Sequence, residues 1–380
     1  MDCQEREALT VKKGFIFLFA LILIITSLGG TSNANAAAVV KISEPTHRLS
    51  NGVFIDDQLA TQLLPNGNLG LLIYPPYRGV RGWQIDPATI SEIVAMSNGY
   101  GISNGQTPTG QQIAKDWLDQ FKKVSRFEQV YPLTYGNPSN RWLKKITPQQ
   151  VDYINAIGKI ELDLFLGKAT QTPLAFNEKR QRLSKFDESI FNYAQRQINL
   201  LSTLVDKKEL DPLQLRLAQL LNPEIEKARM ALLISDFNKL ITQYRNKLKI
   251  TGTKFTITSE KEKLPITVIN DFKSSVKVKL STRVANSKIV VGSVESIEIP
   301  GGEKSQVLLP IQALASGSSG LLAQLTNLEN KPVGYPVNIA LNLSVISPVA
   351  TWITSGAAIL LIIAAMVQSW RRVRRNKNVR

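Results

Sequence analysis

The chain has one cysteine and one histidine among its 380 residues, and these scarcities exclude several kinds of site. Cys3 has no second cysteine with which to form a disulfide. His47 alone cannot supply the several nitrogen or sulfur ligands of a zinc site. A Ser–His–acid triad would have to use His47, in an N-terminal segment that we expect to be mobile. We therefore expect no metal and no cofactor.

The fractions of hydrophobic and charged residues are those of an ordinary globular protein. Hydrophobic residues make up 43% of the chain and charged residues 20%. These values exclude a wholly disordered chain, a collagen-like chain and a polytopic membrane protein. The length predicts two to three domains.

Residues 1–36 have the pattern of a secretory signal peptide. Lys12 and Lys13 precede an apolar stretch over 14–28, and an Ala34-Asn35-Ala36 cleavage site follows. The stretch is shorter than the 18 to 20 apolar residues that an uncleaved anchor needs. We expect cleavage after Ala36, which removes Cys3.

Near the other end, residues 349–367 form an uncharged stretch long enough to span a bilayer. Trp352 and Trp370 lie at its ends, where indole rings favour the membrane interface. The segment 368–380 contains six basic residues and no acidic ones, and we expect these to contact anionic lipids: Arg371, Arg372, Arg374, Arg375, Lys377 and Arg380. Since positive charge stays on the cytoplasmic side, the pattern predicts a single-pass type I protein of the cell membrane, with its bulk outside and a short tail inside.

The predicted extracytoplasmic part is basic. The chain has 46 basic and 30 acidic residues; the signal holds three of each and the tail six basic, which leaves 37 basic against 27 acidic, or +10. Such a surface favours membrane lipids and anionic wall polymers over nucleic acid. Scattered solvated lysines and arginines explain the charge equally well.

Three regions follow the signal. Residues 37–146 mix strand and helix patterns, with strands at 69–74, 83–85 and 127–133 and helices at 87–97 and 110–124, so a small α/β, partly barrel-like unit is expected. Apolar spacing of three or four residues over 147–250 predicts a helical hairpin or bundle, with helix starts at Thr147-Pro148, Asp211-Pro212 and Asn222-Pro223. Alternating patterns over 251–347 predict seven or eight strands of an immunoglobulin-like β-sandwich. The fold class is multidomain α+β with one C-terminal transmembrane helix.

Asp86 is the one weak candidate for a catalytic residue. It follows the strand 83–85, where α/β enzymes place catalytic carboxylates. The preferred interpretation is that Asp86 caps the helix that Pro87 begins. Glu161 and Asp163 could supply a second carboxylate for a glycosidase, but residues two apart do not share a helix face.

Two motifs and the C-terminal part of the chain carry a family resemblance. Leu264-Pro265-Ile266, the Gly301-Gly302 turn, Pro336-Val337, the span and the arginine-rich tail resemble a family of large actinobacterial envelope proteins of unknown function, often encoded beside the lipid II flippase. Trp83-Gln84-Ile85-Asp86-Pro87 is similar to that family's aspartate–proline strand end, and Tyr135-Gly136-Asn137-Pro138 to its tyrosine–glycine–aspartate–proline turn. The resemblance implies a degenerate sugar-processing barrel beside immunoglobulin-like domains. This chain resembles a shortened member.

The sequence departs from that family at the turn. Asn137 stands where the family has a carboxylate, and an amide is neither a general acid nor a general base. We therefore expect a non-catalytic, membrane-anchored protein for binding or scaffolding in the envelope, linked to peptidoglycan precursor export or wall assembly. Its partners would be lipids, anionic wall polymers or a neighbouring envelope membrane protein. The alternative is a reduced glycoside hydrolase that uses Asp86 and a second carboxylate.

Overall fold

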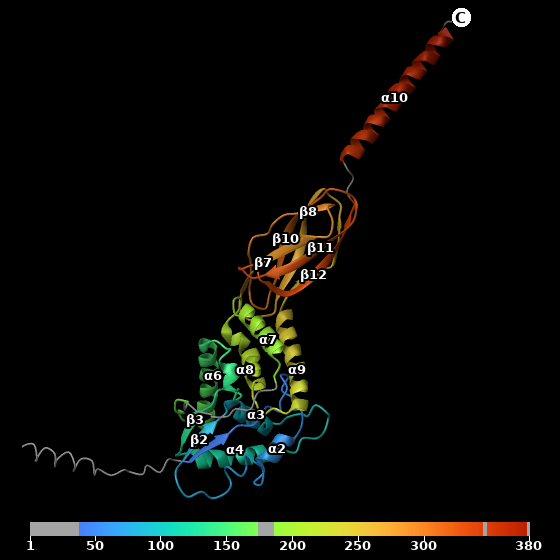
Figure 1. The fold of residues 1–380 in the computed structure, drawn as a ribbon. Coiled ribbons are helices and arrows are strands. Elements are labelled where there is room, and N and C mark those ends of the chain that lie inside the picture. Colours follow the sequence, from blue (N-terminus) through green and yellow to red (C-terminus); the bar gives the residue numbers. More distant parts are fainter. Residues whose placement is uncertain (1–37, 174–185, 345–347, 378–380) are drawn as a thin grey trace, which may run out of the picture.

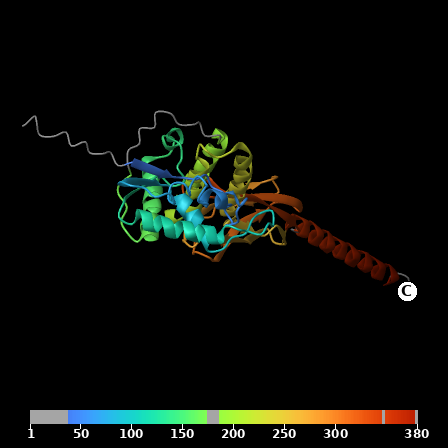
Figure 2. The ribbon, with the colours of Figure 1, turned by 90° about the horizontal axis from the view of Figure 1, so that it is seen from below.

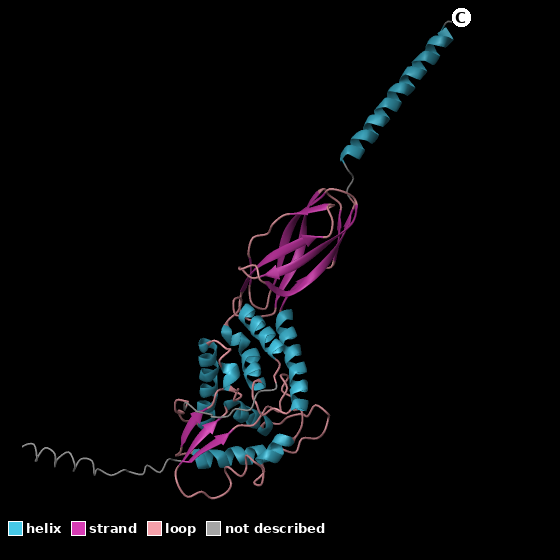
Figure 3. Ribbon diagram, viewed as in Figure 1, coloured by secondary structure: helices cyan, strands magenta, loops and turns pink. Residues whose placement is uncertain are grey.

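The computed structural model describes residues 38–173, 186–344 and 348–377. Figure 1 shows an α/β unit and a set of helices at one end, a β-sandwich in the middle and the long helix α10 at the other end. Colouring by secondary structure separates a small sheet from the sandwich, with helices between them (Figure 3). The protein is therefore a mixed α+β chain, and its N-terminal segment 1–36, where the signal peptide is expected, lies outside the described residues.

A small parallel sheet forms the base of the α/β unit. Its strands lie in the order β1-β2-β3, so it is an open sheet and a barrel-like unit is not confirmed. All five residues of the central strand are buried. Trp83 on that strand packs edge-on against Phe121, which stacks on Trp117. The elements are β1 (Ala38–Ile42), α2 (Gln58–Leu63), β2 (Arg81–Ile85), α3 (Pro87–Ser97), α4 (Gln111–Ser125) and β3 (Gln129–Pro132).

The strand predicted at 69–74 is wrong, because this segment forms consecutive turns. Gly70 lies so close to the end of α2 that an added Cβ would be 1.8 Å from the Leu64 carbonyl oxygen. Leu69 and Ile73 are nevertheless buried, and their carbonyls accept hydrogen bonds from Trp117 and Gln120 on α4. Leu71, which a strand would have placed on the same face as these two residues, is 54% exposed.

Helices occupy most of residues 140–246. They are α5 (Asn140–Leu143), α6 (Pro148–Leu166), α7 (Glu188–Leu201), the 3-10 helix η1 (Lys207–Leu210), α8 (Asp211–Leu220) and α9 (Lys227–Asn246). Prolines stand in the first turns of α6 and α8, as predicted. The start predicted at Asn222-Pro223 is wrong, since α9 begins at Lys227. The Asn222 side chain instead accepts from the Glu224 amide and donates to the Gly136 carbonyl, which makes it part of a turn.

The β-sandwich consists of a four-stranded sheet, β4-β6-β10-β8, and a five-stranded sheet, β5-β12-β11-β7-β9. All pairings are antiparallel except that of β12 with β5. Alternate side chains of the long strands β6 and β10 face the core, as the period-two pattern predicts. The strands are β4 (Leu248–Thr251), β5 (Lys254–Ile257), β6 (Lys261–Asn270), β7 (Val276–Val284), β8 (Ile289–Val291), β9 (Ile297–Ile299), β10 (Lys304–Ala313), β11 (Gly317–Thr326) and β12 (Pro332–Leu343).

Helix α10 (Pro348–Lys377) extends away from the rest of the molecule (Figure 2). Its segment Trp352–Arg372 has a mean hydropathy of 1.8 over 21 residues, and none of it is buried against the chain. By length and composition it is able to cross a membrane.

Candidate functional site

Asp86 lies at the carboxyl end of β2 and is the N-cap of α3. Its Oδ1 accepts hydrogen bonds from the Ala88 amide at 3.0 Å and from the Gly136 amide at 2.7 Å. Its Oδ2 accepts from the Thr89 hydroxyl at 3.3 Å. The carboxylate therefore both caps α3 and fixes the turn at Gly136.

The two N-terminal motifs that carried the family resemblance thus meet in space. Asp86 of one motif holds the Gly136 amide of the other, while Asn222 donates to the Gly136 carbonyl at 3.0 Å. Gly136 and Asn137 both have left-handed backbone conformations, with φ of 77° and 49°. Asn137 donates to the Ser43 hydroxyl at 3.1 Å. Each motif contributes to one tightly held turn.

A hydrolytic role for Asp86 conflicts with its burial. The residue is 0% exposed, so a sugar cannot reach its carboxyl group. Burial raises the pKa of Asp86 to about 7, although the two backbone amides favour the charged form. Glu161 and Asp163 do not form a pair with it: burial and Asp211 raise the pKa of Glu161, whereas Asp163 binds the Thr170 amide and the Lys159 ammonium.

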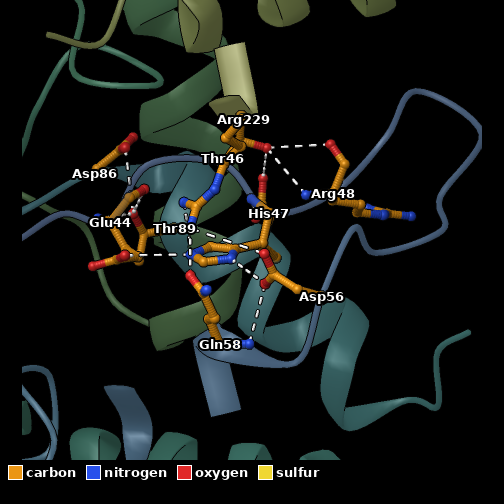
Figure 4. A network of polar contacts seen from close by, with 10 residues as sticks. Glu44, Thr46, His47, Arg48, Asp56, Gln58, Asp86, Thr89 and Arg229 are labelled. Atoms are coloured by element: carbon orange, nitrogen blue, oxygen red, sulfur yellow. Dashed lines mark hydrogen bonds and ion pairs between the residues drawn. The ribbon is translucent and has the colours of Figure 1, made fainter. Parts of the chain in front are cut away.

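His47 lies in a buried polar cluster, shown in Figure 4, and not in the mobile segment expected from its position. Its Nδ1 is 2.8 Å from Asp56 Oδ1, and its Nε2 is 3.3 Å from Glu44 Oε1. Arg229 Nη1, from helix α9, lies 3.1 Å from the same Nε2. Because the Arg229 guanidinium has only donors, the neutral imidazole accepts its hydrogen bond at Nε2. The protonated imidazole instead donates a hydrogen bond from Nε2 to Glu44.

A second set of buried charges joins the α/β unit to helices α8 and α9. Glu92 accepts from the Thr46 hydroxyl, from the His47 amide at 2.9 Å and from Gln219 at 3.4 Å. Arg216 donates to Gln219 at 3.2 Å and to Asp236 at 3.0 Å. Burial raises the pKa of Glu92 and lowers that of Arg216, and in each case the neighbouring opposite charge acts in the other direction.

A pocket of about 200 Å³ borders this second set of charges. We call it the junction pocket, because it lies where the loop after β1, helix α3 and helices α8 and α9 meet. Its lining comprises Arg48, Leu49, Ser50, Ser91, Glu92, Tyr135, Pro212, Leu215, Arg216, Gln219 and Leu240. Asp86 is not among these residues.

Sequence reasoning missed Glu92 and Arg216, although each carries a recognisable signal. Each is a single charged residue within an apolar helical window, Ile90-Ser91-Glu92-Ile93 and Leu215-Arg216-Leu217. A charge on such a face is buried and needs a partner. The partner could not be identified, because it comes from a distant part of the chain.

The cationic residues from Arg371 to Lys377 continue helix α10. Arg371 and Arg372 are exposed, whereas the side chains of Arg374, Arg375 and Lys377, and all of Arg380, lie outside the described residues. Within residues 38–173, 186–344 and 348–377, no cluster of three or more His, Cys, Asp or Glu side chains could hold a metal ion.

Replacing His47 with glutamine should flatten the pH dependence of stability. Burial alone lowers the pKa of His47, but its hydrogen bonds to Asp56 and Glu44 outweigh this, and the net pKa lies above 6.5. The stabilisation is complete below the unfolded-state pKa and is lost as the pH rises through the folded-state pKa. Urea denaturation in detergent micelles at about pH 6 and pH 8, monitored by tryptophan fluorescence, should show a larger decrease for the wild type than for His47→Gln. Equal decreases in the two proteins would show that the hydrogen bonds to Asp56 and Glu44 do not raise the pKa of His47.

A sequence profile of a family of unknown function (DUF6049) matches residues 144–378. No curated protein matches the chain. Parts of the chain are similar to solved structures. WR4, a C. elegans MSP family member, is 11% identical, and the match covers 26% of this chain and 98% of that chain with a TM-score of 0.20. PapD-like domain 7 of human CEP192 is 14% identical (27% of this chain, 86% of that chain, TM-score 0.21), and the E. coli chaperone DraB is 13% identical (25% of this chain, 54% of that chain, TM-score 0.20).

Proposed function

The chain belongs to DUF6049, a family of unknown function, and from this starting point we propose that it is a non-catalytic, membrane-anchored protein of a bacterial cell envelope. Its α/β and helical module is held outside the membrane on a β-sandwich stalk, where it binds or scaffolds other envelope components. The finer assignment, to an actinobacterial protein that acts beside the lipid II flippase in peptidoglycan precursor export or wall assembly, is part of the same proposal.

The observation that carries this proposal is the exposure of α10. Leu361 is 72% exposed and Leu360 68%, although both are large aliphatic residues. An uncovered apolar surface of this length needs another covering, and a lipid bilayer supplies one of the right thickness. Arg371 and Arg372 follow directly, as positive residues do on the cytoplasmic side.

The carboxylates near the sheet support a binding role over a hydrolytic one. Asp86 is fully buried and bound to two backbone amides, and Glu92 is held by Thr46 and the His47 amide. Groups with these partners stabilise the fold, and a glycan substrate would have to displace those contacts. Anionic wall polymers and a neighbouring membrane protein are the partners that we propose.

Deletion of residues 348–380 tests the anchoring. We expect the full chain to stay in the membrane pellet after carbonate extraction and the truncated chain to leave it as a folded, soluble protein. Native tryptophan fluorescence of the released chain controls for misfolding, and Arg371→Gln/Arg372→Gln, which keeps the apolar span, should remain in the pellet. Extraction of the full chain, or retention of the truncated one, would contradict the proposal.

A further inference from the structure

The three strands of the small parallel sheet begin along one edge, which we call the amino edge. Val39, Gly82 and Gln129 lie side by side across the strands near this edge. Figure 1 shows β2 and β3 at the end of the molecule opposite α10. The amino edge is therefore remote from the helix that we propose as the membrane anchor.

Large apolar side chains are exposed where each of the three strands begins. Val39 in β1 is half-exposed, Val80 directly before β2 is 71% exposed, and Phe127 just before β3 is 90% exposed. Tyr77, in the loop that leads to β2, is also half-exposed. Single exposed apolar residues are ordinary, but several at one edge mark a surface that another molecule covers.

Contacts between side chains join the loops before β2 and β3 into one surface. The Arg81 guanidinium lies 4.7 Å from the centre of the Tyr77 ring, and its Nε is 3.5 Å from Glu128 Oε1. Glu128 directly follows Phe127, and the Arg126 guanidinium lies 5.1 Å from the centre of the Phe127 ring. The two exposed rings are thus held by neighbouring, connected arginines.

The amino edge is also positively charged. Lys168 belongs to it, because its ammonium donates to the carbonyls of Ser125, Arg126 and Glu128. Together with Lys168, the segments 77–81 and 119–128 hold six basic residues and two acidic ones, or +4: Arg78, Arg81, Lys122, Lys123, Arg126 and Lys168 against Asp119 and Glu128. Such a surface attracts a polyanion and repels a second copy of itself.

The exposed rings restrict which polyanion fits. An aromatic ring has a flat apolar face, and the C–H face of a sugar ring is able to stack on it, whereas a chain of phosphates has no such face. A sugar stacked on Phe127 would carry its substituents close to the Arg126 guanidinium. Guanidinium groups bind planar carboxylates through two parallel hydrogen bonds, so a carboxylate on the sugar ring matches this arrangement.

We infer that the amino edge binds an acidic polysaccharide whose sugar rings carry carboxylates. Phe127 and Tyr77 contact the sugar rings, and Arg78 and Arg126 bind the carboxylates. This inference rests on the proposed binding of anionic wall polymers, and it adds the site and the chemistry of the polymer.

Isothermal titration calorimetry of the full chain in nonionic detergent micelles, with polygalacturonate as the polymer, tests the inference. We expect polygalacturonate to bind and Phe127→Ala to weaken the binding about fivefold, because a stacking surface is lost. Tyr335→Ala is the matched control. It removes a ring from β12 in the sandwich that is also exposed and also has an arginine beside it, since Arg245 lies 3.8 Å from its centre, and it should leave the affinity unchanged.

A pair of double variants tests the charge in the same way. Arg78→Gln/Arg126→Gln should weaken polygalacturonate binding about tenfold or more. Lys277→Gln/Lys331→Gln removes the same charge from exposed positions on the sandwich and should have a much smaller effect. The basic tail after the span is present in all of these proteins, so its own attraction for a polyanion cancels in the comparison.

Two further polymers separate the sugar from the charge. Dextran, a neutral polysaccharide, should not bind. Poly-L-glutamate has carboxylates without sugar rings, so Phe127→Ala should not change its affinity.

Absence of polygalacturonate binding would overturn the inference, as would binding of dextran or equal losses in an amino-edge variant and its control on the sandwich. An equal loss of poly-L-glutamate binding in Phe127→Ala would also overturn it and would indicate an acidic protein as the partner. None of these results bears on carbonate extraction, so failure of the ligand assignment and failure of the anchoring proposal are distinguishable.

Discussion

Replacing Gly136 with alanine is expected to destabilise the protein by about 3–5 kcal/mol, because a steric clash adds to an unfavourable backbone conformation. A Cβ at this position would lie 2.5 Å from the Gln219 Cα and 2.7 Å from the Gln219 nitrogen. Both atoms belong to the backbone of α8 and cannot turn away as a flexible side chain would. The free energy of unfolding from urea denaturation measures the effect.

Gly105 provides a matched control for this substitution. It has the same φ of 77°, but an added Cβ would meet no atom within 4 Å. Gly105→Ala should therefore show the conformational cost alone, about 1–2 kcal/mol. If the two variants lose equal stability, the close approach of the turn to α8 does not contribute, and this description of the turn is wrong.

The second large effect is expected at Asp86, where alanine and asparagine should behave differently. Asp86→Ala leaves the buried amides of Ala88 and Gly136 without an acceptor and should cost about 2–4 kcal/mol. At about pH 4, where the folded-state carboxyl of Asp86 is still protonated, Asp86→Asn keeps a carbonyl oxygen at the position that accepts both bonds and should stay within about 1 kcal/mol of the wild type. Asp187→Ala, at the exposed cap of α7, should cost less than Asp86→Ala.

The pH dependence of stability provides a second test of the buried Asp86 carboxyl group. The folded-state pKa of Asp86 is about 7, above the usual 3.8. Between these values the folded chain holds a proton that the unfolded chain has released, so the contribution of Asp86 decreases as the pH rises from about 4 to about 7. Asp86→Asn removes this slope, so its free energy of unfolding should increase relative to that of the wild type as the pH rises across that interval. An unchanged slope in the asparagine variant, or equal losses for alanine and asparagine, would contradict the capping role.

The parts of the fold that local patterns determine are the parts that the sequence predicts. Helix α3 has the bounds 87–97 in prediction and in structure, because Asp86 and Pro87 mark its start and apolar residues recur along it. Helices α6 and α8 likewise begin at the predicted Thr147-Pro148 and Asp211-Pro212. In these cases neighbouring residues contain the whole signal.

Predictions fail where distant contacts decide the structure. Strand β11 begins with Gly317-Ser318-Ser319-Gly320, which has the composition of a loop, and this segment is a strand because it pairs with β12. The turns at 69–74 depend on the contact of Gly70 with the end of α2.

The candidate site was predictable only in part. The cap at Asp86 follows from Asp86-Pro87, but its bond to Gly136 joins residues 50 positions apart. The pair of Arg216 and Thr46 is 170 positions apart, and no periodicity relates such residues. The junction pocket therefore becomes visible only once helices α8 and α9 are packed against the loop after β1.

The central claim, that α10 spans the membrane with the folded module outside, is tested most directly by labelling single cysteines. Cys3 is the only cysteine, so a Cys3→Ser chain provides a thiol-free background. Glu329→Cys places a thiol on the sandwich, at a side chain that is 61% exposed, and Asn378→Cys places one in the basic tail. With a membrane-impermeant maleimide on spheroplasts, we predict labelling at position 329 before permeabilisation and at position 378 only after it. Labelling of position 378 alone in sealed spheroplasts, or of neither position, would contradict the claim.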